Sequence, residues 1–191
     1  KQTLGRVRTV VFHYSQGIIN NGTHAIDLLR FLIGDVKRVQ AVIPVSQPRP
    51  IDMDPSVAGI LEMETGVMAY LITDRDITYS HFVIEMVCEE GKIVSEPIGD
   101  RLVIYGLHDS QQYAGFRIMD SQGCSISIDA GRAFPAIAAN ILLGGELDGS
   151  LSDGRDGLHA LRAALAIRRS AVRGGKWEWL RPHPLEISES E

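Results

Sequence analysis

The order of its periodic segments is the feature that most restricts the fold of this chain. Between residues 36 and 128 most segments have strand character, with β-branched and aromatic residues separated by turn-forming glycine, proline and acidic residues. Helical periodicity precedes this run over 23–33 and follows it over 133–143 and 153–173. Runs of strands with segregated helices are typical of α+β domains. We therefore expect an α+β fold, with a large, mostly antiparallel, open-faced sheet and helices packed on one face.

Turn residues bound the expected strands. Thr65-Gly66 predicts a hairpin, and the proline-rich stretch 47–55 predicts a loop. The expected strands span 7–14, 36–45, 57–64, 67–73, 81–88, a short piece near Ile93, 102–105, 116–119, 124–128 and 177–180.

The long helix over 153–173 has an apolar set with helical spacing, which predicts the face that it buries. That set is Leu158, Leu161, Ala164, Leu165, Ala171 and Val172. With all helices on one side, no remaining segment covers the other face of the sheet. We expect that face to pair with a second copy, as a dimer or tetramer, or with a domain outside this chain.

Composition argues against several classes of function. The net charge of −5 does not suit a nucleic-acid partner, which needs a basic face. No stretch of about 18 apolar residues predicts a membrane span. Cys88 and Cys124 belong to no CxxC pair, which argues against a disulfide framework or a metal site and favours reduced thiols in the cytoplasm. The chain has no Gly-x-Gly-x-x-Gly loop, so no cofactor-binding residues are expected in it.

The stretch that points to chemistry opens the first helix. Thr23 or Asn21 is a plausible N-cap, Gly34 a plausible stop, and His24 then falls in the first turn. A polar ligand there would meet the side chains of Asn20 and Asn21, free backbone N–H groups and an imidazole. The helix dipole would disfavour the imidazolium and leave His24 able to act as a general base.

A structural explanation of the same residues stays open. Asn21 or Thr23 can be a cap only, with His24 merely packed. Asp27 lies on the same helical face as His24. It can orient the ring through a hydrogen bond or simply favour the first turn through the dipole.

The run from Gly17 to Gly34 resembles the motif that opens the C-terminal domain of the Gfo/Idh/MocA oxidoreductases. That motif is roughly Gly-x-x-Asp-x-Gly-x-His-x-x-Asp, followed by an apolar helix. His24 matches the histidine that the family places beside the reacting carbinol, Asp27 matches the later aspartate, and Asn20 stands where many members have aspartate. Residues 82–93 and 152–171 are similar to later parts of the same domain, so the resemblance spans almost the whole chain.

The resemblance implies that residues 1–181 form one substrate-binding and oligomerising domain, followed by a polar tail over 182–191. The parent would be an NAD(P)-dependent dehydrogenase that oxidises a CH–OH group of a sugar, sugar nucleotide or cyclitol. NAD or NADP would be held mainly by an N-terminal Rossmann domain outside this chain, and the chain alone is expected to be inactive. The alternative is a stand-alone, non-catalytic oligomerisation or ligand-binding module.

The resemblance also suggests roles for individual residues. His24 is the expected acid–base residue, and Asn20, Asn21, Asp27 and Tyr14 are the expected substrate contacts.

Overall fold

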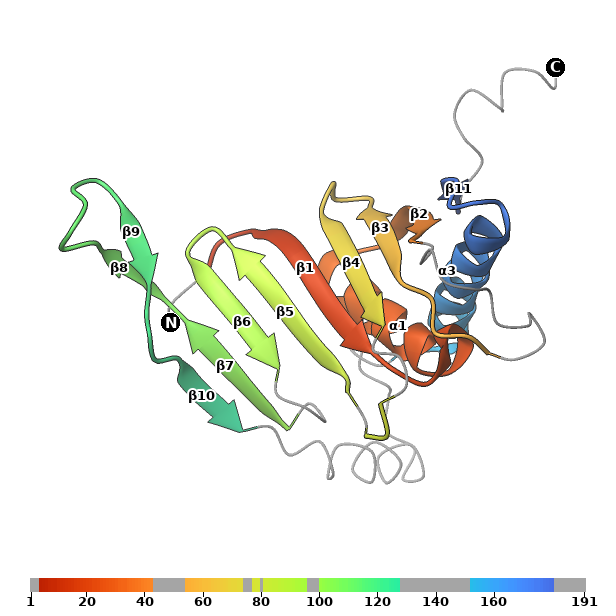
Figure 1. Ribbon diagram of the computed structural model, residues 1–191, viewed down its shortest axis with the longest axis horizontal. Helices are drawn as coiled ribbons and strands as arrows, with labels where there is room; N and C mark the ends of the chain where they lie inside the picture. Colours follow the sequence, from red (N-terminus) through yellow and green to blue (C-terminus); the bar gives the residue numbers. More distant parts are fainter. Residues whose placement is uncertain are drawn as a thin grey trace, which may run out of the picture.

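The structure is a computed structural model that describes residues 4–42, 54–73, 77–79, 81–95, 100–127 and 152–180. Within these residues a nine-stranded sheet has the order β10-β7-β6-β5-β1-β4-β3-β2-β11, and β8 and β9 form a separate two-stranded sheet. Helices α1 and α3 lie near the β2 end of the large sheet (Figure 1). The α+β fold with a large, mostly antiparallel sheet is confirmed.

The elements follow in chain order. They are β1 (Val7–Tyr14), η1 (Gly17–Asn21), α1 (Gly22–Ile33), β2 (Val36–Ala41), β3 (Gly59–Met63), β4 (Met68–Thr73), β5 (Val83–Cys88), β6 (Gly91–Ser95), β7 (Arg101–Tyr105), β8 (Leu107–Asp109), β9 (Arg117–Met119), β10 (Cys124–Ser127), α3 (Gly154–Val172) and β11 (Glu178–Trp179).

The first strand occupies the middle of the large sheet. β1 runs parallel to β4, with Phe12 opposite Leu71, and antiparallel to β5, with Phe12 opposite Ile84. The other paired strands of the described chain are antiparallel. One face of β1 carries Val10, Phe12 and Tyr14, all fully buried.

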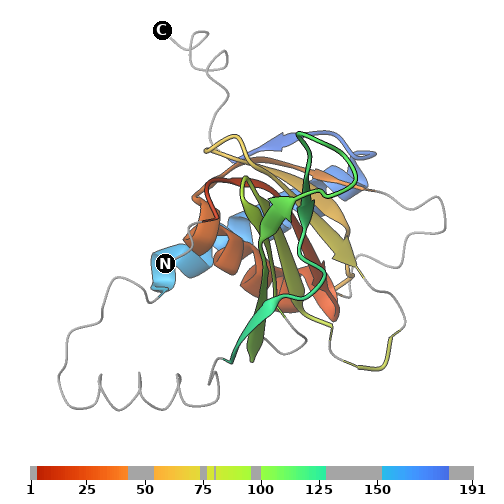
Figure 2. The ribbon, with the colours of Figure 1, turned by 90° about the vertical axis from the view of Figure 1, so that its left-hand side faces the viewer.

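Both helices lie on one side of the sheet (Figure 2). Alternate residues of the strands therefore enter the core with the helices, and the residues between them point to the opposite, open face. This open face includes Tyr70 and Ile72 of β4 and Val87 of β5, each more than a third exposed.

The face that α3 buries differs in part from the one predicted, although Ala164 of the predicted set is fully buried. Leu158, Leu165 and Val172 are exposed, whereas the helix packs against β2 and α1 through small residues. The buried residues of α3 are Ala160, Ala163, Ala164, Ala166, Ile167 and Ser170. Short side chains let the helix backbone approach closely, and the Ser170 hydroxyl accepts the backbone N–H of Ala41 at 2.8 Å. Close approach outweighed the larger transfer free energy of the leucines.

The remaining sequence predictions have mixed outcomes. The hairpin at Thr65-Gly66 is confirmed between β3 and β4. Strand β8 was missed, because Leu107–Asp109 is too short to show a period. The helix predicted over 133–143 lies outside the described residues. No helix of the described chain is long and apolar enough to cross a membrane.

Candidate active site

The helix that carries His24 starts earlier than the sequence predicted. A π-helical turn, η1, runs from Gly17 to Asn21 and continues directly into α1. Asn21 has helical backbone angles and makes no capping hydrogen bond, so the predicted cap at Asn21 or Thr23 is wrong. The Thr23 hydroxyl instead donates to the carbonyl oxygen of Ile19 at 2.7 Å. π-turns inside helices occur frequently at functional sites.

A loop more than thirty residues later caps this helix. The Asp54 carboxylate accepts the backbone N–H of Ile19 at 2.9 Å and that of Asn20 at 2.8 Å. Ser56 Oγ accepts the N–H of Gly17 at 3.0 Å. The first N–H groups of the helix are thus already bonded, and the free backbone donors that the sequence analysis expected for a ligand are not available there.

Gly17 makes this cap possible. Its φ of 92° lies in the left-handed region, and a Cβ atom on it would lie 2.1 Å from Asp54 Oδ2. Any other residue would displace the capping carboxylate.

Asn20 and His24 are the exposed polar residues that this arrangement presents. They are four positions apart, a spacing that places two side chains on one side of a helix. Within the described part of the chain, His24 has no hydrogen-bond or ion-pair partner. His24 lies in the second turn of the continuous helix, and the start of that helix is capped by the Asp54 carboxylate. The expected effect of a free helix N-terminus on the imidazole is therefore absent.

Asp27 contacts residues at the start of α3, and no hydrogen bond joins it to His24. The Ser152 hydroxyl donates to Asp27 Oδ2 at 2.6 Å, just before α3 begins. Arg30, whose side chain is 11% exposed, lies 3.8 Å from Asp27, 2.7 Å from Asp35 and 3.3 Å from Asp156. These contacts fasten α1 to the start of α3, which is the role that we assign to Asp27.

Tyr14 is hydrogen-bonded to the capping loop at Val57. Its hydroxyl donates to the carbonyl oxygen of Val57 at 2.7 Å and accepts the N–H of Val57 at 2.9 Å. The side chain is fully buried, and this burial raises the pKa of Tyr14 well above its ordinary value. Tyr14 therefore positions the capping loop, and its hydroxyl uses both its donor and an acceptor site on the backbone of Val57.

Asn21 is half-buried beside these groups. Of the five residues singled out from the sequence, only Asn20 and His24 are both exposed and adjacent. The capping role of Asp54 was not predicted, because nothing in a proline-rich loop marks this residue as the partner of a helix 34 positions away.

Residues 13–94 run from the end of β1, through the helix start and its capping loop, into β6, and they match the family model of the GFO/IDH/MocA C-terminal domain. This stretch therefore resembles the Gfo/Idh/MocA C-terminal domain, as the motif at the start of the first helix indicated. No curated protein matches the sequence.

Solved structures of several oxidoreductases share the fold of this chain. A levoglucosan dehydrogenase in complex with NADH and levoglucosan aligns with a TM-score of 0.67 and 18% identity, covering 94% of this chain and 60% of that one. An oxidoreductase from Agrobacterium radiobacter in complex with NAD+, L-tartaric acid and magnesium gives 0.59 and 17%, with coverages of 93% and 58%. An NAD binding oxidoreductase from Klebsiella pneumoniae gives 0.61 and 15%, with 94% and 60%. The chain thus spans about 60% of the length of these relatives.

A dinucleotide does not fit the start of η1 or the start of α3, the two helix starts in the described residues. The start of η1 holds the Asp54 carboxylate. The start of α3 holds a capping box in which Asp153 accepts the N–H of Asp156 and the Asp156 carboxylate accepts the N–H of Asp153. Pyrophosphate binding uses free N–H groups at a helix start, and carboxylates at both sites would repel it. The described residues also contain no cluster of three or more potential metal ligands.

Proposed function

We propose that this chain is the substrate-binding part of an NAD(P)-dependent dehydrogenase that oxidises a hydroxyl group of a carbohydrate-like molecule. The observation that carries the proposal is the exposed pair Asn20 and His24, on a helix start whose first backbone N–H groups are already bonded. Support comes from the Gfo/Idh/MocA match and from relatives bound to NADH with levoglucosan or L-sorbose.

The chemistry of the two side chains suits a carbinol. Oxidation of an alcohol releases the hydroxyl proton, and a neutral imidazole within hydrogen-bond reach accepts it. Asn20 carries both a donor and an acceptor, so its amide can hold a neighbouring hydroxyl of a polyol and fix which carbon lies beside His24. Because a dinucleotide fits neither described helix start, we propose that it is bound by a part of the protein outside this chain.

We also propose that the open face of the sheet pairs with a second copy. That face exposes Tyr70, Ile72 and Val87, although large apolar side chains are commonly buried in a monomer. Pairing would remove these side chains from water.

His24→Ala in the full-length protein tests the catalytic part of the proposal. Turnover of levoglucosan or another accepted polyol, followed by NADH formation, is expected to fall by about 10²-fold or more. His159→Ala is the matched control, because His159 is an exposed histidine on α3. Unchanged turnover in His24→Ala would defeat the acid–base role. A full-length wild type with no NAD(P)-dependent oxidation of any polyol would favour a non-catalytic binding module.

A further inference from the structure

Helix α3, at the end of the molecule beyond β2, carries apolar side chains on two opposite faces (Figure 1). Leu158, Leu165 and Val172 are 46%, 39% and 68% exposed, and seven positions separate each from the next. A spacing of seven places side chains along one line of a helix. Leu165 and the buried Ile167 are two positions apart and point about 160° from each other, so this outer line lies opposite the buried alanine face.

Arginine side chains follow the outer line on one side. Arg155, Arg162 and Arg169 are all exposed, and each precedes one of the three apolar residues by three positions. That spacing makes the two sets neighbours on the helix surface, and we call the three arginines the arginine line. Arg169 shares the Glu178 carboxylate with Arg173. Within the described residues Arg162 forms no ion pair.

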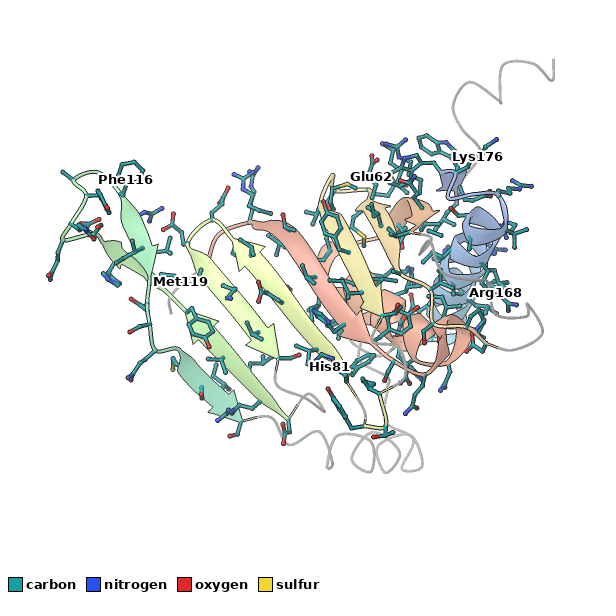
Figure 3. The ribbon with its side chains drawn as sticks, viewed as in Figure 1. Glu62, His81, Phe116, Met119, Arg168 and Lys176 are labelled. Carbon is teal, nitrogen blue, oxygen red and sulfur yellow. The ribbon has the colours of Figure 1, made fainter. Side chains whose placement is uncertain are left out.

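The outer side of α3 therefore concentrates positive charge in a chain whose net charge is −5. Figure 3 shows two further cations, Arg168 and Lys176, at this end of the molecule. The acidic side chain within α3 is Asp156, which lies 3.3 Å from Arg30 and accepts the N–H of Asp153. Because Asp156 is engaged there, it does not neutralise the arginine line.

A pocket of about 220 Å³ opens beside the arginine line, between α1, α3 and the end of β11. Arg30, Asp35 and Arg162 belong to its lining. The Arg30 guanidinium lies 2.7 Å from Asp35, so these two charges are paired with each other. Arg162 is then the cation that can bind a carboxylate side chain entering the pocket.

We infer that the outer face of α3 binds an acidic amphipathic helix of a partner protein. Apolar residues of that helix pack on the outer line, and its carboxylates pair with the arginine line. An apolar repeat of seven residues with charges beside it is typical of surfaces through which two helices pair. The inference is independent of the dehydrogenase chemistry and of the pairing of the sheet face.

Other occupants match this face less well. A second copy of α3 in an antiparallel two-fold contact would bring the two arginine lines together, and like charges would repel. A membrane surface suits a helix with a broad apolar face and aromatic anchors. The outer line is narrow, and α3 contains no tryptophan or phenylalanine.

Fluorescence anisotropy with the full-length protein tests the inference. The probe is a dye-labelled synthetic peptide of about three heptads, with leucine at positions a and d and glutamate at positions e and g. A matched peptide has lysine in place of every glutamate. The glutamate peptide is expected to bind at least about tenfold more tightly, and salt should reduce this difference because it screens exposed charges. Equal binding of both peptides, or binding of neither, would overturn the inference.

Variants locate the contact on α3. Arg155→Glu combined with Arg162→Glu is expected to reverse the preference between the two peptides, and binding of the lysine peptide would also show that the variant is folded. Leu158→Ser combined with Leu165→Ser should raise the dissociation constant of the glutamate peptide by at least about tenfold. Ile126→Ser, at a side chain of β10 that is also 46% exposed, is the matched control and should leave it unchanged. An unchanged preference in the arginine variant would contradict the assigned contact.

Two further measurements distinguish the other occupants. Leu165→Cys in the full-length protein is expected to react with a maleimide, and the glutamate peptide should protect it. Protection without the peptide would mean that another part of the same protein covers α3, which would overturn the inference. Wild type is not expected to sediment with vesicles of phosphatidylcholine and phosphatidylserine. Sedimentation that is lost when Leu158 and Leu165 are replaced by serine would assign the face to a membrane surface instead.

Discussion

The carboxylate of Asp54 accepts the backbone N–H of Asn20 at 2.8 Å and joins a loop to a helix start 34 positions earlier in the chain. The same carboxylate accepts the N–H of Ile19. Tyr14 fastens the other end of this loop through Val57. The position of the exposed pair Asn20 and His24 therefore depends on contacts made on both sides of the loop.

Asp54→Ala is expected to lower the free energy of unfolding by about 1 kcal/mol, the usual cost of removing a helix-capping side chain. Urea denaturation, monitored by circular dichroism, measures this change in the free energy of unfolding. Asp100→Ala, at another exposed aspartate, is the matched control and should change stability by less than about 0.5 kcal/mol. Equal stability of the two variants would show that the cap contributes nothing.

Tyr14→Phe is expected to lower the free energy of unfolding at neutral pH by about 1–3 kcal/mol. It keeps the buried ring but leaves the backbone N–H and carbonyl of Val57 without their partner. The sign of the pH dependence follows from the raised pKa of Tyr14. The contribution of the neutral hydroxyl is fully present below the ordinary tyrosine pKa of about 10 and is lost as the pH rises above it.

Thermal unfolding of wild type and Tyr14→Phe at a series of alkaline pH values measures this dependence. The difference between them should narrow above about pH 10, because the variant has no hydroxyl to ionise at this position. A difference that stays constant or widens there would contradict the assigned role.

Glu62→Gln is expected to lower stability in a pH-dependent way. Hydrogen bonds from Lys37, and then from Arg38, hold the pKa of Glu62 below its ordinary value against the opposing effect of burial. The contribution of a lowered carboxyl pKa is present above the unfolded value of about 4.3 and is lost as the pH falls through the folded value.

Chemical denaturation between neutral and acid pH checks this prediction. Wild type should exceed Glu62→Gln by a constant margin near neutral pH, and the margin should shrink below about pH 4. Glu64→Gln, which removes an exposed carboxylate two positions away, is the comparison variant. A margin independent of pH would show that the charge of Glu62 is not the source of its effect.

The two faces of α3 should respond differently to substitution. Ala163→Leu is expected to cost about 1–3 kcal/mol, because Ala163 is fully buried in the contact of α3 with the core. Leu165→Ala, at a side chain 39% exposed, should cost less than about 1 kcal/mol. Denaturation midpoints compare the two. The reverse order would mean that α3 packs through its leucines after all.

What the sequence predicted correctly is local. The stop of α1 at Gly34 and the hairpin at Thr65-Gly66 depend on glycines whose positive φ is set by their immediate neighbours. The match of residues 13–94 to the model of the Gfo/Idh/MocA C-terminal domain likewise agrees with one continuous motif in the sequence.

What the sequence did not predict depends on distant parts of the chain. The cap of η1 comes from Asp54, and the choice of an alanine face on α3 depends on how closely β2 approaches it. Tyr14 was predicted as a substrate contact, yet its hydroxyl is engaged by Val57, 43 positions later. Periodicity gives the elements but not the distance at which they pack.

The central position of β1 has a consequence for how the molecule assembles. β1 separates β10-β7-β6-β5 from β4-β3-β2-β11, so among the described strands it alone joins these two halves of the sheet. The ladder between β1 and β5 extends to Cys88, which pairs with Val7. During synthesis the ladder between β1 and β5 therefore cannot be completed until residue 88 has left the ribosome. Because so many of its contacts are distant in sequence, we expect slow refolding, and deletion of β1 should separate the sheet into two independent halves.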